Sequence, residues 1–285
     1  MAPSAFSDIA KSSNDLINRD FYHATAATLE VKLKSPDGLA ITAKGTSPHD
    51  GDIAGSVEGK KIIQKGITAT STWTNASVAT VKLELDDILA AGVKAEYIGT
   101  YAPKTGLKAQ KGNLYFKQGA FHARAFGEYT PATGNVNATV DGVVAHEGFL
   151  VGGEAGFDVQ KAALTRYAAA FGYVTPVYSM AVTATNSLSV FTAGYYHRVN
   201  PAVEAGVKAA YDTKTNSTVG IEVATKYKID PTAFAKFKLN DRGIVSLAYN
   251  ARINSGFTFG IGASLDAQKL NEAGHKIGTS FTFEG

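Results

Sequence analysis

Charged side chains recur at every second position along much of the chain, a spacing that could attract, repel or conduct ions. In residues 217–229 (STVGIEVATKYKI), Glu222, Lys226 and Lys228 share one parity, while valine, isoleucine and tyrosine dominate the other. Successive side chains of a β-strand point to opposite faces. The pattern therefore predicts strands with one charged face and one apolar face.

Other kinds of chemistry have little support. The six histidines are scattered singly, without the spacing of a metal site, and the chain contains no cysteine. No GxSxG motif and no phosphate-binding loop occurs. We therefore expect no catalytic residues, no metal and no cofactor, and the protein is not predicted to be an enzyme.

The alternating pattern continues to the end of the chain. It recurs, for example, in residues 28–34 (TLEVKLK), 79–85 (ATVKLEL) and 257–266 (FTFGIGASLD), with turn signals such as SPDG and LNDRG between the runs. The runs predict about nineteen strands of about nine to eleven residues, the length that a tilted strand needs to cross a bilayer.

Composition excludes membrane-spanning helices but not a membrane barrel. Of the 285 residues, 45% are hydrophobic and 19% are charged. No window holds the ~18 uninterrupted apolar residues of a spanning helix. Alternating strands escape such a search because their two faces average out.

Helical periodicity is convincing only near the start. In residues 6–22, Phe6, Ile9, Ala10, Leu16 and Ile17 can share one stripe, which predicts an amphipathic helix of about four turns. Ser7 or Asp8 is expected to cap it. The start has neither a secretory signal nor the acid-poor character of a transit peptide. We expect residues 1–25 to form an N-terminal segment with this helix and residues 26–285 to form the barrel.

The charged face could point outward on a soluble protein or inward on a membrane protein. A soluble or scaffold β protein that binds nucleotides or protein partners is the alternative interpretation. So many amphipathic strands with one helix favour a closed membrane barrel, because every backbone polar group must be bonded internally in lipid. Tyrosines also fall at run ends, as in an interfacial girdle: Tyr101, Tyr129, Tyr173, Tyr178, Tyr211, Tyr227 and Tyr249. The charged face would then line a water-filled pore.

Three segments resemble the mitochondrial outer-membrane porins, the voltage-dependent anion channels. Residues 227–249 (YKIDPTAFAKFKLNDRGIVSLAY) are similar to the family signature, apart from Phe237 at a position where a small residue is usual. DFYH at residues 20–23 is like that of fungal members. HKIGTSFTFEG at the other end resembles the sorting signal of mitochondrial barrels.

The resemblance implies a transmembrane β-barrel of nineteen strands, with the first and last strands parallel and the N-terminal helix in the lumen. It also implies a voltage-gated, weakly anion-selective pore of the mitochondrial outer membrane that passes ATP, ADP, phosphate and small ions. A non-conducting porin paralogue stays an alternative, and a bacterial-type porin is disfavoured. Ser71 stands where animal members carry a membrane-facing glutamate before the tryptophan, so regulation through that acid is not expected.

The face assignment gives a set of inward cations that would contact nucleotides or anions and set selectivity. These residues are Lys11, Arg19, Lys32, Lys94, Lys226, Lys228, Lys236 and Lys238. Charges on the helix and the first strands are the candidate voltage sensor: Lys11, Asp15, Arg19, Lys32 and Lys44. For the wall charges, the alternative is a solvated face without any role in selectivity. For Lys11 and Arg19, the alternative is that they only hold the helix against acidic wall residues.

The resemblance adds a weak nucleotide patch, which aligns with a site proposed in relatives. It consists of Ile244, Val245, Ser246, Gly262, Ala263, Ser264, Leu265 and Asp266. The expected partners are the lipid bilayer and the permeating ATP, ADP and small anions. Self-association and cytosolic protein partners are open, and no nucleic acid is expected because the lysines do not gather into a patch.

Overall fold

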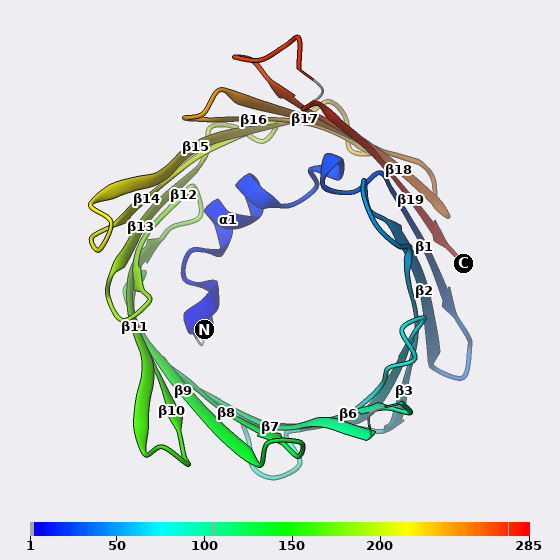
Figure 1. Cartoon of the computed structure of the whole chain (residues 1–285), viewed down its shortest axis with the longest axis vertical. Coiled ribbons are helices and arrows are strands. Elements are labelled where there is room, and N and C mark those ends of the chain that lie inside the picture. The colour runs from blue at the N-terminus through cyan, green and yellow to red at the C-terminus, as the bar shows by residue number, and fades with distance from the viewer. Residues whose placement is uncertain (1–2, 105, 273) are drawn as a thin grey trace.

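The computed structural model describes residues 3–104, 106–272 and 274–285, and within them the chain forms a closed barrel of 19 strands around a short helical segment (Figure 1). The strands are β1 Ala27–Lys34, β2 Leu39–Ser47, β3 Ala54–Gln64, β4 Ile67–Thr74, β5 Ala79–Asp86, β6 Val93–Ala102, β7 Gly106–Gln118, β8 Phe121–Thr130, β9 Asn135–His146, β10 Phe149–Asp158, β11 Ala163–Val174, β12 Tyr178–Thr185, β13 Val190–Arg198, β14 Val203–Asp212, β15 Ser217–Lys228, β16 Ala233–Asn240, β17 Ile244–Asn254, β18 Phe257–Asp266 and β19 Lys276–Glu284. The expected strand number is confirmed.

The barrel closes between its first and last strands. β1 pairs with β19 in parallel, with Leu29 opposite Phe281, whereas consecutive strands pair antiparallel. An odd number of up-and-down strands leaves the first and last strands running in the same direction, so they can only meet in parallel. Closure leaves no free sheet edge, as hydrocarbon requires.

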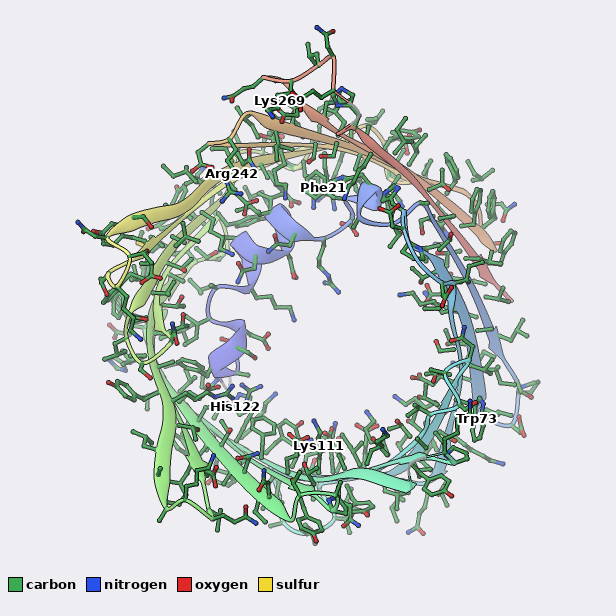
Figure 2. All side chains as sticks on the ribbon, viewed as in Figure 1. Phe21, Trp73, Lys111, His122, Arg242 and Lys269 are labelled. Atoms are coloured by element: carbon green, nitrogen blue, oxygen red, sulfur yellow. The ribbon has the colours of Figure 1, made fainter. Side chains whose placement is uncertain are left out.

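The strands present their apolar face outward and their charged face to the lumen (Figure 2). On β15, Val219, Ile221, Val223 and Tyr227 are exposed on the outer surface. Between them, Glu222 forms an ion pair with Lys238 of the next strand. Phe237 is also exposed on the outer face, as expected, so it fits the lipid-facing position despite its size.

The N-terminal segment lies inside the barrel but is less helical than expected. It consists of η1 Phe6–Asp8, α1 Lys11–Asn18 and η2 Tyr22–Ala24. The predicted cap at Ser7 or Asp8 is wrong: α1 follows Ala10, and no side chain caps it. The helix stops because Arg19 is extended and Asp20 adopts a positive φ of 62°. Among the described residues, no helix is long and apolar enough to cross a membrane.

The predicted apolar stripe packs against the wall. Phe6 and Ile9 contact Val143 and Leu150 on β9 and β10. Further along, Leu16 and Ile17 pack on Ala224 of β15. Figure 1 shows α1 inside the lumen near β12–β15. The charged side of the segment is therefore left toward the open bore.

Candidate functional site: the charged lumen

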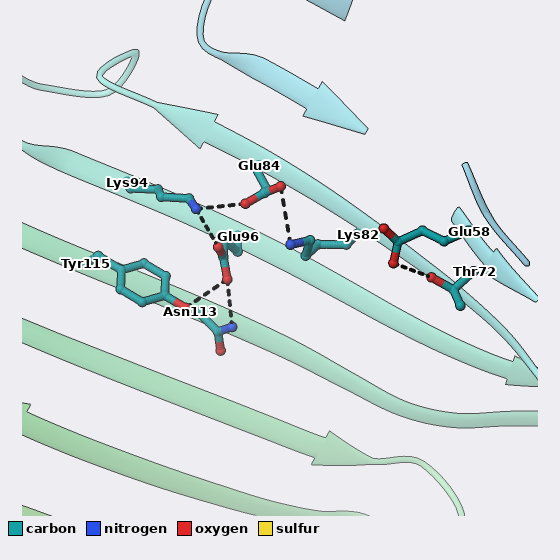
Figure 3. Close-up of polar contacts among 8 residues, drawn as sticks. All are labelled: Glu58, Thr72, Lys82, Glu84, Lys94, Glu96, Asn113 and Tyr115. Atoms are coloured by element: carbon teal, nitrogen blue, oxygen red, sulfur yellow. Dashed lines mark hydrogen bonds and ion pairs between the residues drawn. The ribbon is translucent and has the colours of Figure 1, made fainter. Parts of the chain in front are cut away.

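One network of charges covers the wall formed by β5, β6 and β7 (Figure 3). Lys94 Nζ lies 2.7 Å from Glu84 Oε1 and 2.8 Å from Glu96 Oε1. Lys82 pairs with the other oxygen of Glu84 at 3.2 Å. The Tyr115 hydroxyl donates to Glu96 at 2.8 Å. Alternate lysines and glutamates on neighbouring strands thus neutralise much of each other's charge.

A second group joins the wall to the start of the N-terminal segment. Arg124 on β8 donates through Nε and Nη2 to both oxygens of Asp141 on β9, at 2.7–3.0 Å. Its remaining Nη1 donates to Ser7 Oγ at 3.2 Å. The Asp141 side chain is only 1% exposed, so this carboxylate depends on Arg124 for compensation.

Lys236 on β16 holds the other end of the segment. Its Nζ donates to the carbonyl of Arg19 at 2.6 Å and to that of Asp15 at 3.3 Å. It also lies 3.8 Å from Asp20 Oδ2 and 4.8 Å from the Phe21 ring centroid. The Asp15 carbonyl also accepts the Arg19 N–H, so Lys236 is its second donor, whereas the Arg19 carbonyl lies past the end of α1 and accepts from Lys236.

The expectation that Lys236 contacts permeating anions is therefore wrong for this conformation. Its side chain is 1% exposed because α1 and Phe21 cover it. Lys238 is partly shielded as well, since it pairs with Glu222 at 3.3 Å and lies 5.1 Å from the Phe21 ring. Face alternation placed both lysines inward, but the segment lies between them and the bore.

Other predicted cations face the bore, and nearby acids neutralise their charge to different degrees. Lys32 pairs with Glu30 and Glu284, and Lys228 pairs with Glu204 at 3.0 Å. On the segment, Lys11 lies 4.0 Å from Asp8, and Arg19 lies 3.3 Å from Asp15. The side chains of Lys11 and Arg19 stay 56% and 68% exposed, so water and solutes can reach them.

A few inward lysines lack an acidic partner. Within the described part of the chain, no carboxylate lies within ion-pair distance of Lys44, Lys208 or Lys226. Lys226 Nζ instead sits 4.0 Å from the Phe234 ring centroid, a cation–π contact. These lysines leave positive charge on the wall that no acid at ion-pair distance neutralises.

The strand register divides the expected nucleotide patch. Val245 pairs with Leu265, and both belong to the outer parity together with Leu247 and Ala263. Gly262 is inward, but the backbone of Tyr22 and His23 covers it. Ser246 is inward too, but it is only 2% exposed. The eight residues therefore cannot form one aqueous surface; only Ile244, Ser264 and Asp266 share the inner parity and keep some exposure.

Sequence reasoning missed several lumen charges. Lys111 on β7 points into the bore (Figure 2) and pairs with Glu128 at 3.1 Å. Asp141 was also not singled out, although it is the buried partner of Arg124. Lys111 was predictable in principle, because it alternates with Asn113, Tyr115 and Lys117. The irregular start of β7 obscured this pattern.

Tyr22 provides a pH-dependent contact between the segment and the wall. Burial raises the pKa of the Tyr22 hydroxyl to about 12, with a further increase from nearby Asp20 that the Asn250 hydrogen bond opposes. Because the native pKa lies above the ordinary value, the neutral phenol stabilises the docked segment below about pH 10, and this contribution is lost as pH rises through about 12. Ultraviolet titration should show a final step near pH 12, and Tyr22→Phe should remove the contribution of one tyrosine from that step. Loss of that contribution in Tyr195→Phe instead would contradict the assignment.

The arrangement can conduct ions but offers no reaction. A closed barrel of this size, with an apolar outer face and a charged inner face, defines a membrane-spanning pore. The described charges pair with one another or face water, and none is organised around a bound group. The class of protein is thus a β-barrel porin.

Comparisons with known proteins place the chain within this class. The family model described as eukaryotic porin matches residues 2–278. The mitochondrial outer membrane protein porin of Neurospora crassa is 53% identical, with both chains covered completely. The non-selective voltage-gated ion channel 1 of Saccharomyces cerevisiae is 37% identical, again over both whole chains. A mutant of the Rh. blastica porin shares the fold, with a TM-score of 0.50, 10% identity and coverage of 80% of this chain and 89% of that one.

The chain belongs to the eukaryotic porin family. It is a voltage-gated pore of the mitochondrial outer membrane and not an enzyme. The soluble alternative is not favoured.

Proposed function

We propose that the lumen is weakly anion-selective and that ATP, ADP, phosphate and small anions diffuse through it. The observation that carries this proposal is the set of cations that neighbouring acids leave uncompensated or exposed: Lys44, Lys208 and Lys226 on the wall, with Lys11 and Arg19 on the segment. Rings of cationic side chains favour anions in a wide pore. Extensive pairing elsewhere keeps the preference weak.

Lys11 and Arg19 are the residues proposed to touch nucleotide phosphates. Both are exposed on a segment that occupies part of the bore, where a passing solute comes closest. Arg19 offers a planar fork that suits phosphate oxygens. Lys32, Lys94, Lys228 and Lys238 are paired with acids, so we assign them to shaping the field and not to direct binding.

The voltage sensor is proposed to comprise Lys11, Asp15, Arg19, Lys32 and Lys44. Moving one elementary charge through a potential of 100 mV changes the free energy by about 2.3 kcal/mol. A small displacement of these charges therefore gives voltage-dependent closure. Self-association and binding of cytosolic proteins remain proposals without a residue assignment.

Reversing the segment charges tests this proposal. We expect Lys11→Glu with Arg19→Glu to lower the anion preference and to make the voltage dependence shallower, because both exposed cations become acids near the narrowest part of the bore. The measurement is the reversal potential and the conductance–voltage curve in a KCl gradient. Lys269→Glu is the control, because Lys269 lies on a loop outside the bore (Figure 2). An unchanged reversal potential in the double variant would refute the assignment.

A further inference from the structure

Glycine and alanine are frequent in the wall beneath the N-terminal segment. Gly152, Gly172, Gly194 and Gly206 face the first part of the segment from β10, β11, β13 and β14. Their cross-strand neighbours include Ala170, Ala181 and Ala224, all of which are buried. Gly260, Gly262 and Gly278 face its second part from β18 and β19. We call these seven glycines the glycine track.

The glycines of the first part each meet a particular side chain. A Cβ atom at Gly172 would lie 2.7 Å from Ile9 Cγ2, and one at Gly206 would lie 2.9 Å from Leu16 Cδ2. At Gly194 it would lie 2.5 Å from Ser13 Oγ. These separations are shorter than carbon atoms adopt in packed interiors. A larger residue at any of these positions therefore forces the facing side chain of the segment out of its present place.

In the second part, Gly260 meets the ring of Tyr22, whereas Gly262 and Gly278 meet backbone. A Cβ at Gly262 would lie 2.8 Å from the Tyr22 nitrogen and 2.9 Å from the His23 nitrogen. At Gly278 it would overlap the carbonyl oxygens of Tyr22 and Thr25. A side chain can rotate away from such a clash, but a backbone cannot. Here a substitution must move the whole segment.

The spacing of the segment matches the spacing of the strands. Ile9 covers β11 and β12, Ser13 covers β13, and Leu16 covers β14. These residues are three or four positions apart, which is about one helical turn of ~5.4 Å, while neighbouring strands are ~4.8 Å apart. Successive turns can thus reach successive strands, and small residues on the wall let them approach closely.

We infer that the glycine track consists of positioning residues, which set where the N-terminal segment docks and hence the shape of the bore. The track specifies the docked arrangement from the wall side, as the apolar stripe does from the segment side. The charges of Lys11 and Arg19 are held at fixed places in the lumen as a result. This inference does not depend on which solutes permeate.

A single-cysteine reporter tests the inference. Ile17 is 0% exposed, and the chain has no cysteine, so Ile17→Cys provides one thiol that is covered only while the segment is docked. The track variant is Gly194→Leu with Gly206→Leu in this background. The matched control is Gly220→Leu, which also points inward but whose Cβ would meet only Asp241 Oδ1, at 4.0 Å. Refolded proteins are treated with a water-soluble maleimide, and circular dichroism verifies the barrel.

We expect the thiol to be protected in the parent and in the Gly220→Leu control, and to react at least about tenfold faster in the track variant, with altered single-channel conductance. A barrel that folds and keeps the thiol protected in the track variant would overturn the inference. Gly194→Ala with Gly206→Ala adds only the two clashing Cβ atoms, so it tests the track if the leucines prevent folding. Protection of the thiol in this folded alanine variant would also overturn the inference. Labelling is independent of ion selectivity, so failure of the proposed function would be seen separately.

Discussion

Arg124→Ala is expected to destabilise the barrel by about 3–5 kcal/mol, because it leaves the buried Asp141 carboxylate without its compensating charge. The same substitution removes three hydrogen bonds to Asp141 and the donor to Ser7 Oγ. The free energy of unfolding, measured by denaturant titration of the refolded protein in detergent, should therefore fall steeply.

Arg166→Ala is the matched control for Arg124→Ala. Arg166 also pairs with an acid on the neighbouring strand, Glu154 at 3.2 Å, but its side chain is 59% exposed. Exposed ion pairs contribute about 0–1 kcal/mol, so this variant should barely change the unfolding curve. Equal effects of the two variants would show that burial of Asp141 is not what makes the Arg124 pair important. Recovery of stability in Arg124→Ala with Asp141→Ala would support the explanation further.

Lys236→Met is expected to release the carboxyl end of α1. The substitution removes the donor to the carbonyls of Arg19 and Asp15, while the methionine fills a similar volume. A hydrogen bond from a charged donor contributes about 1.5–3 kcal/mol, and 1.4 kcal/mol corresponds to a tenfold shift in a docking equilibrium. The undocked population should therefore rise by about tenfold or more.

Limited trypsin digestion measures this release. The protease is too large to work inside the lumen, so it should cut after Lys11 or Arg19 only when the segment leaves the bore. Lys228→Met is the control: it removes a lumen lysine that pairs with Glu204 and not with the segment. Cleavage should accelerate in Lys236→Met and not in Lys228→Met. Equal cleavage in both variants would contradict the role of Lys236 in holding α1.

The barrel was predictable because the residue pattern of each strand depends on the lipid and water at its two faces. A strand between lipid and water must alternate, so the pattern around Glu222, Lys226 and Lys228 indicates both the strand and its faces without knowledge of any neighbour. The outward direction of Phe237 was predicted in this way. The parallel closure of β1 on β19 was predicted from the family resemblance. The full length of the N-terminal helix was not, because the extended Arg19 and the positive φ of Asp20 end it early.

What covers a residue was not predictable from alternation. Lys236 obeys the inward pattern like Lys226 and Lys228, yet it is buried by residues more than 200 positions away in the chain. The Asp141 pair with Arg124 depends on strand register, which sequence periodicity alone does not give. The track glycines look like ordinary strand glycines until the segment is placed against them.

Anion-selective, voltage-gated conduction is tested most simply by the current through the purified protein in a planar bilayer. The voltage is stepped to both polarities under a KCl gradient. We predict discrete large openings with a weak preference for chloride near zero voltage and closure at either polarity. A cation preference, or no conductance from protein shown to be folded and inserted, would contradict anion-selective conduction through this barrel.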